Sequence, residues 1–173
     1  MKQRNIPPRG APRGRRIAGH AQLDHVTDTY KTQRKLPEPT RCPGCGAVYH
    51  DGQWRWMTQP PVKAHEELCT ACHRINDDFP AGVVTLRGPV VREQKAELLR
   101  VARHQEAAEK AEHPLNRIMG VEEAAPDTLR ITTTDIHLPR RIGEAVHRAF
   151  HGDLKLHYDE ERYFVRVDWH RET

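Results

Sequence analysis

The clearest pattern of apolar and polar positions lies in the C-terminal stretch 127–173. Residues 139–150 place apolar side chains at helical spacing, and Gly152 follows as a stop signal. Three flanking segments have strand-like patterns, at 129–134, 154–158 and 163–169. The order predicts a βαββ module. The helix stripe expected to face its sheet consists of Ile142, Val146, Ala149 and Phe150.

A second alternating pattern surrounds Asp51-Gly52, a dipeptide that favours a two-residue type I′ turn. Counting outward from that turn places His50 opposite Gln53 and Tyr49 opposite Trp54. The predicted hairpin, 47–56, therefore carries Tyr49, Trp54 and Trp56 on one face. These aromatic side chains form either the core of a small module or a base-stacking surface beside Arg55.

The middle of the chain predicts mainly helix. Residues 83–87, bounded by glycines, predict a last strand of the hairpin module. Strong helix formers with mixed charge predict a helix over 90–111, with Pro89 near its first turn. A shorter helix is predicted over 115–123, with 124–126 as a linker.

Composition argues against one large core, because 36% of the residues are hydrophobic and 30% are charged. We therefore expect an α+β protein made of small modules. The predicted division is a basic, largely disordered arm at 1–38, a ribbon at 39–88, a charged helical linker at 89–126 and the βαββ module at 127–173.

Positive charge is concentrated at the start of the chain. Residues 1–41 contain ten Lys and Arg against three Asp and Glu, although the net charge of the whole chain is only +4. Prolines and glycines interrupt this stretch and leave little to bury, which predicts disorder. Such an arm is either a solubilising tail or a segment that binds nucleic-acid phosphates.

The four cysteines of the chain form two CxxC pairs, Cys42/Cys45 and Cys69/Cys72. Two such turns supply the closed, tetrahedral thiolate set of a structural zinc site. The spacing also allows an iron–sulfur site, two disulfides or a redox pair. No secretory or membrane-spanning apolar run occurs, so we expect a cytoplasmic protein with one structural Zn2+.

Sequence motifs of catalysis are missing. The chain has no phosphate-cradling glycine loop, no GxSxG and no HExxH, and a four-thiolate zinc has no open position for substrate. We therefore expect neither an enzyme nor a small-molecule substrate. Candidate nucleic-acid contacts are cations and the two hairpin tryptophans: Arg13, Arg15, Arg16, Arg34, Lys35, Trp54, Arg55, Trp56, Arg141 and Arg148.

The CPGCG turn, the second CxxC and the basic lead-in resemble a group of bacterial zinc-ribbon proteins linked to ribosome stability and mRNA decay. The stretch 133–145 is also similar to that group. Within 42–72 the chain resembles the zinc-ribbon region of the eukaryotic large-subunit export adaptor associated with nonsense-mediated decay. That resemblance implies a metal-binding role for the four cysteines.

These observations favour a zinc-ribbon protein that binds structured RNA, on or near the ribosome. The main alternative is a protein–protein interaction adaptor, because zinc ribbons often dock proteins. A transcription-associated, DNA-binding regulator ranks third, since no recognition helix is evident.

Overall fold

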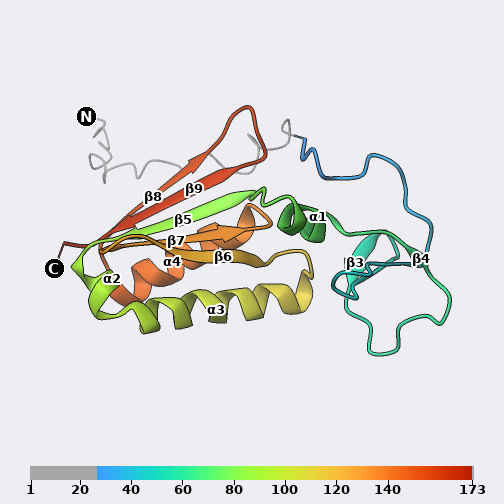
Figure 1. Cartoon of the computed structure of the whole chain (residues 1–173), viewed down its shortest axis with the longest axis horizontal. Helices are drawn as coiled ribbons and strands as arrows, with labels where there is room; N and C mark the ends of the chain where they lie inside the picture. The colour runs from blue at the N-terminus through green and yellow to red at the C-terminus, as the bar shows by residue number, and fades with distance from the viewer. Residues whose placement is uncertain (1–26, 173) are drawn as a thin grey trace, which may run out of the picture.

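The computed structural model describes residues 27–172, which form an α+β fold with two mixed sheets and four helices. The smaller sheet lies at one end of the molecule, beyond α1 (Thr70–Asn76), and the larger sheet forms the main body (Figure 1).

The smaller sheet consists of very short strands in the order β3-β2-β1-β4. A hairpin of β2 (Val48–His50) and β3 (Gln53–Arg55) is extended by β1 (Thr40–Arg41) and by β4 (His65–Glu66), which runs parallel to β1. We call residues 40–76, which include this sheet and α1, the ribbon.

The hairpin prediction is confirmed at the turn. Asp51 and Gly52 both have positive φ, at 51° and 77°, as a type I′ turn requires. His50 pairs with Gln53 and Tyr49 pairs with Trp54. The strands end at Val48 and Arg55, so Trp56 lies beyond the paired register.

The larger sheet has five strands in the order β6-β7-β5-β9-β8. The strand bounds are β5 (Gly82–Arg87), β6 (Ile118–Ala125), β7 (Thr128–Thr133), β8 (Asp153–Tyr158) and β9 (Val165–His170). β5 is central, antiparallel to β7 and parallel to β9, and the remaining pairs are antiparallel.

Helices cover one face of this sheet. α4 (His137–Phe150) packs on its central strands, and α3 (Lys95–Glu112) packs against α4 on the same side (Figure 1). The short α2 (Pro89–Glu93) follows β5 and ends at Gln94, so the predicted long helix is two helices with a break. Pro89 is at the start of α2, as expected.

The core lies between these layers. Fully buried Val84, Leu86, Ile131, Val167 and Trp169 of the sheet meet apolar residues of the helices. Gly143 lets α4 approach closely, because a Cβ there would lie 2.5 Å from the Val167 Cγ1 atom. On the uncovered face the strands present mainly polar residues, the alternation expected of a half-exposed sheet.

One predicted strand belongs to the other sheet. Residues 83–87, expected to finish the ribbon, form β5 and separate β7 from β9. Val84, Thr85 and Leu86 in succession are buried, and such a continuous run suits a central strand better than the edge of a small sheet.

The prediction of a helix over 115–123 and a linker at 124–126 is wrong. Ile118–Ala125 is β6, which pairs with β7 across a tight turn at Pro126 and Asp127. Leu, Met, Glu and Ala are good helix formers, but intrinsic propensities differ by less than about 1 kcal/mol per residue, and pairing with β7 overrides that preference. In α4, Ala149 is exposed, and Leu138, Pro139 and Ala145 join the buried residues instead.

The described end of the basic arm, 27–38, contacts the ribbon. Asp28 accepts a hydrogen bond from the buried Arg74 of α1 at 2.5 Å, and the Tyr30 hydroxyl donates to Asp77 at 2.8 Å. Asp28 and Tyr30 therefore have defined contacts, although the whole of 1–38 was expected to be largely disordered. The rest of that prediction falls on residues 1–26, outside the described part of the chain.

Candidate metal centre

The first pair of cysteines lies on a tight turn that follows β1. The Cys42 amide donates to the Ala47 carbonyl and the Gly46 amide donates to the Cys42 carbonyl, each at 2.8 Å. Gly46 has a φ of 80°, a conformation that glycine adopts without strain. Gly44 leaves room for the second pair, because a Cβ on it would lie 3.0 Å from the Cys72 sulfur.

The second pair lies at the start of α1. Cys69 is the N-cap residue, and its sulfur accepts a hydrogen bond from the Cys72 amide at 3.4 Å. The Cys69 amide in turn donates to the Cys42 sulfur at 3.3 Å. These amide–sulfur contacts join the two turns and stabilise negative charge on the sulfurs.

The four sulfurs lie within 4.8 Å of one another. The sulfurs of Cys45 and Cys69 are 3.8 Å apart, far longer than a disulfide bond of about 2.05 Å, and all four cysteines are free. A tetrahedral metal with bonds of about 2.3 Å to sulfur has sulfur–sulfur edges near 3.8 Å. The cluster therefore fits one four-coordinate structural metal ion.

Burial and charge distinguish the four thiols. A hydrogen bond with Cys69 lowers the pKa of Cys45 to about 5, and the same contact, together with burial, raises the pKa of Cys69. Burial also raises the pKa of Cys72, against a hydrogen bond from Arg117. A metal cation bound by the four cysteines would hold them as thiolates.

Arg117 reaches the cluster from the other sheet. Its Nη2 atom donates to the sulfurs of Cys69 and Cys72 at 3.5 and 3.4 Å. A divalent ion with four thiolates carries a charge of about −2, so a buried guanidinium offsets part of it. Burial lowers the pKa of Arg117, but its contact with Cys72 and the charges of the cysteines outweigh this and raise the pKa overall.

The backbone of Arg117 is anchored next to β6. Its amide donates to the Thr134 hydroxyl and its carbonyl accepts from the Thr134 amide, both at 2.9 Å. The Arg117 side chain therefore links the metal centre to the five-stranded sheet. Trp54, Leu68 and Leu115 pack around the cysteines and complete the shell.

Histidines do not belong to this cluster. His50 instead forms a separate, largely exposed group with Glu38 and Asp51. The Glu38 carboxylate accepts hydrogen bonds from the amides of Asp51 and Gly52 at 2.8 and 3.2 Å, which explains its position as a cap on the hairpin turn.

The predicted nucleic-acid contacts fall in several places. Arg13, Arg15 and Arg16 lie outside the described residues. Arg34 pairs with Glu67 at 2.9 Å, Lys35 is exposed, and Arg141 pairs with the buried Glu109 at 2.9 Å. Arg34 and Arg141 line one cleft together with Trp54, whereas Lys35, Arg55, Trp56 and Arg148 are not among the residues that line it.

The aromatic candidates have different environments. Trp54 is half-buried against the cysteines and lies edge-to-face with Tyr49, with ring centroids 5.6 Å apart. Trp56 is exposed, and its indole nitrogen donates to the Lys110 carbonyl at the end of α3, at 2.7 Å. Arg55 lies 3.8 Å from Asp51. Trp54 thus serves the core of the ribbon, and Trp56 joins the ribbon to α3.

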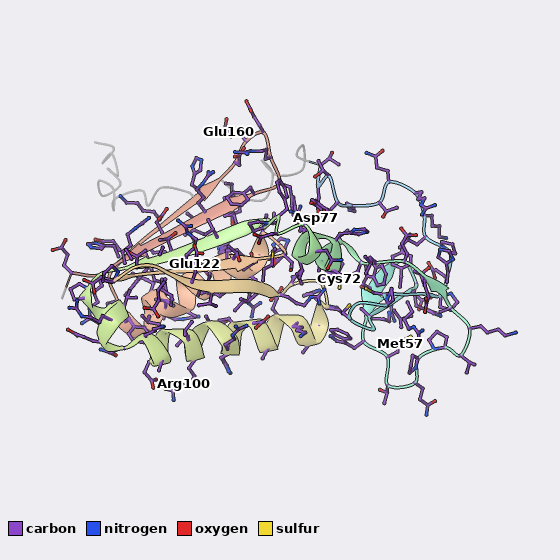
Figure 2. All side chains as sticks on the ribbon, viewed as in Figure 1. Met57, Cys72, Asp77, Arg100, Glu122 and Glu160 are labelled. Carbon is purple, nitrogen blue, oxygen red and sulfur yellow. The ribbon has the colours of Figure 1, made fainter. Side chains whose placement is uncertain are left out.

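Arg148 lies in a shallow groove between α3 and α4. The groove has a volume of about 450 Å³, and Arg100 and His104 of α3 also line it. No Asp or Glu is among its lining residues in the described part of the chain. Arg100 is on the side of α3 that faces away from the sheet (Figure 2).

Sequence reasoning missed Arg117 and Arg74. Arg117 lies within 115–123, the segment predicted as a helix, so nothing in the pattern brought it near the cysteines. Arg74 is only 2% exposed, and its guanidinium lies 4.4 Å from the centre of the Tyr30 ring. The only available signal was its place two residues after Cys72, on a helix that the metal turn starts.

Comparisons with protein-family models, with curated proteins and with solved structures find no match to this chain. Within residues 27–172, no helix combines the length and the apolar character needed to cross a membrane.

Proposed function

We propose that this protein is a cytoplasmic zinc-ribbon protein that binds structured RNA on the ribosome and affects ribosome stability or mRNA decay. Its metal would be zinc, since four cysteine thiolates at tetrahedral spacing are the ligand set of structural zinc sites. A closed ligand shell supports a structural rather than a catalytic role for the metal.

The observation that carries the proposal is the groove between α3 and α4. Arg100, His104 and Arg148 line it without a carboxylate among the described lining residues, which favours an anionic partner. Arg100 has one carboxylate contact, to Glu97, and Arg148 is exposed. Arginine side chains recognise phosphate by paired hydrogen bonds, so the sugar-phosphate backbone of RNA fits this groove.

The basic arm supports the same partner. Residues 1–41 contain ten Lys and Arg against three Asp and Glu, and phosphate neutralisation by such a segment gives affinity that falls with salt. The resemblance of the cysteine turns and of 133–145 to ribosome-linked bacterial proteins favours ribosomal RNA over other RNAs.

The test is co-sedimentation of the tagged full-length protein with ribosomes, at low and high salt and with and without RNase. We expect salt-sensitive migration with a ribosomal subunit. Replacing Arg13, Arg15 and Arg16 with glutamine should weaken the association and flatten its salt dependence, and Arg148→Gln should weaken it further. Protein that stays at the top of the gradient in every condition would contradict the proposal. Metal analysis of the same preparation distinguishes zinc from iron.

An adaptor role is the second candidate, supported by exposed apolar residues in the loop between β3 and β4. Met57 is 36% exposed and Val62 fully exposed, and Met57 lies at the ribbon end of the molecule (Figure 2). The adaptor predicts that the wild type captures a protein partner but does not co-sediment with ribosomes. Substituting Met57 and Val62 by serine would then abolish capture of that partner.

A further inference from the structure

We infer that the cleft between the ribbon and the start of α4 holds one unpaired nucleotide of the bound RNA. This inference rests on the proposed function and assigns a second, distinct contact to it. The base lies against aromatic side chains of the cleft, and the adjoining phosphates contact its cations.

The cleft has a volume of about 810 Å³, larger than that of the groove between α3 and α4. This volume falls within the range of sites that hold small organic ligands. Its walls come from separate segments: the end of the basic arm, the β2–β3 hairpin, the loop at 113–116, the start of α4 and the loop after β8. Both sheets therefore contribute to one site that neither sheet forms alone.

Four half-buried aromatic residues line the cleft: Tyr49, Trp54, Tyr158 and Tyr163. Each has ring surface that remains partly accessible, although three of them also pack on a core. Stacking of a base on an aromatic ring contributes roughly 1–3 kcal/mol and tolerates any sequence. An unpaired base is the part of an RNA that offers such a flat surface.

Cations surround the same space. Arg140 and Arg141 reach it from α4, and Lys31 and Arg34 reach it from the arm. The Nε atom of Arg140 contacts Glu144 at 2.7 Å and the Nη1 atom of Arg141 contacts Glu109 at 2.9 Å. A guanidinium has five N–H donors, so donors remain on each arginine for a phosphate.

The helix N-terminus itself is closed to the ligand. The Asp135 Oδ2 atom already accepts hydrogen bonds from the amides of His137 and Leu138, at 2.7 and 3.0 Å. A phosphate in the cleft is therefore bound by the side chains of Arg140 and Arg141 rather than by the backbone of α4.

The path of the chain explains why RNA, rather than a free metabolite, enters the cleft. Arg74 holds the end of the arm through Asp28 and the Tyr30 ring. Lys31 and Arg34 follow at once and line the cleft. An RNA strand whose phosphates contact the basic arm therefore passes close to the cleft. One of its bases unstacks from its neighbours and enters the cleft.

The experiment measures binding of fluorescent oligouridine, of a duplex RNA and of uridine monophosphate to the full-length, metal-loaded protein. Tyr158→Ala removes a ring from the cleft, and Arg140→Gln removes a guanidinium. We expect each to weaken oligouridine binding about tenfold, the equivalent of one lost stacking or phosphate contact. Tyr158→Phe keeps the ring and should bind like the wild type.

Arg166→Gln is the matched charge control, because Arg166 lies on the exposed face of β9 and does not line the cleft. Metal content and circular dichroism show whether each variant is folded. Tyr158 packs partly on the core, so Arg140→Gln keeps the test decisive if Tyr158→Ala unfolds. Photocrosslinking with thiouridine-substituted RNA should label peptides of the cleft.

The outcomes separate this inference from the proposed function. If Tyr158→Ala and Arg140→Gln bind oligouridine like the wild type, or if crosslinks are confined to other segments, the proposal of a nucleotide in the cleft is wrong. RNA binding itself would not be contradicted by either result. Absence of binding to any RNA would overturn both. Uridine monophosphate bound as tightly as oligouridine would show a free nucleotide as the ligand and overturn the assignment to an RNA strand.

Discussion

The ribbon and the five-stranded sheet are stabilised in different ways. The ribbon has strands of two or three residues, and its buried cluster contains Cys42, Cys69, Ala71 and Cys72. The five-stranded sheet and its helices bury eighteen residues in one apolar cluster within the described part of the chain. We expect the first region to depend on a metal ion, whereas the second is stabilised by the hydrophobic effect.

This difference shows why the two regions meet where they do. The ribbon has little apolar surface of its own, and Leu115 from the loop before β6 packs against its cysteines. Polar contacts add to this junction, from Arg117 to two cysteine sulfurs and from the Trp56 indole to the Lys110 carbonyl. Loss of the metal should therefore affect the ribbon and this junction before the five-stranded sheet.

The largest expected effect follows from removing the metal ligands. In Cys42→Ser with Cys69→Ser, we expect no bound metal and loss of folded structure over 40–76, because binding of structural zinc contributes on the order of 10 kcal/mol. Residues 82–133 and 137–170 should stay folded. Hydrogen–deuterium exchange, read segment by segment, measures both.

Chelator treatment of the wild-type protein is the matched control and should give the same pattern. Ribbon amides that remain protected from exchange in the variant would show that the metal does not stabilise the fold of this region. Equal loss of protection in both regions would show that the five-stranded sheet depends on the metal too.

The reverse experiment weakens the apolar core. Ile131 is completely buried, and Ile131→Ala should lower the free energy of unfolding of the five-stranded sheet by about 2–5 kcal/mol. Metal stoichiometry should stay at one ion per chain. Chemical denaturation gives the first quantity and metal analysis the second.

Lys155→Ala, on the exposed face of β8, is the control and should change stability by less than about 0.5 kcal/mol. Loss of metal from the folded Ile131→Ala protein would contradict the independence of the two regions.

The two regions should also differ in their response to acid. Burial raises the pKa of Asp135 from 3.8 to about 6, against hydrogen bonds from the amides of Leu138 and His137, with a smaller contribution from Glu109. The folded carboxyl group therefore binds its proton more tightly than the unfolded one. Its contribution to stability grows as pH falls from above 6 towards 3.8, whereas protonation of thiolates weakens metal binding.

Asp135→Asn removes this titration and keeps an oxygen acceptor for the helix amides. The difference in unfolding free energy between wild type and variant should shift in favour of the wild type by up to about 3 kcal/mol over that pH range. Denaturation of both proteins at several pH values measures it. A difference that does not vary with pH would contradict the raised pKa.

The smallest expected effect concerns the link between the regions. Arg117→Gln removes the guanidinium that contacts Cys69 and Cys72, and we expect metal affinity to fall about 10- to 100-fold. Competition with a chromophoric chelator measures this affinity. Arg103→Gln, which loses only an exposed pair with Glu106, should bind metal as the wild type does. Equal affinities in all three proteins would show that Arg117 does not stabilise the centre.

Short-range patterns determined several parts of this protein. The two CxxC turns indicated a joint metal site, and the four sulfurs lie together. Asp51-Gly52 specified the hairpin and its register, because a type I′ turn fixes which residues are opposite each other. The α4 helix and the strands beside it followed from the spacing of apolar residues over a single element.

Tertiary structure decided how the elements combine. Residues 83–87 have a strand pattern that fits either sheet, and only the presence of β7 and β9 on both sides made them the centre of the larger one. The segment 118–125 is a strand because it forms backbone hydrogen bonds with β7. Their contribution outweighs the small free-energy preference of its residues for helix. Arg117 and the cleft share this origin, since each depends on residues that are distant in sequence and that no local pattern brings together.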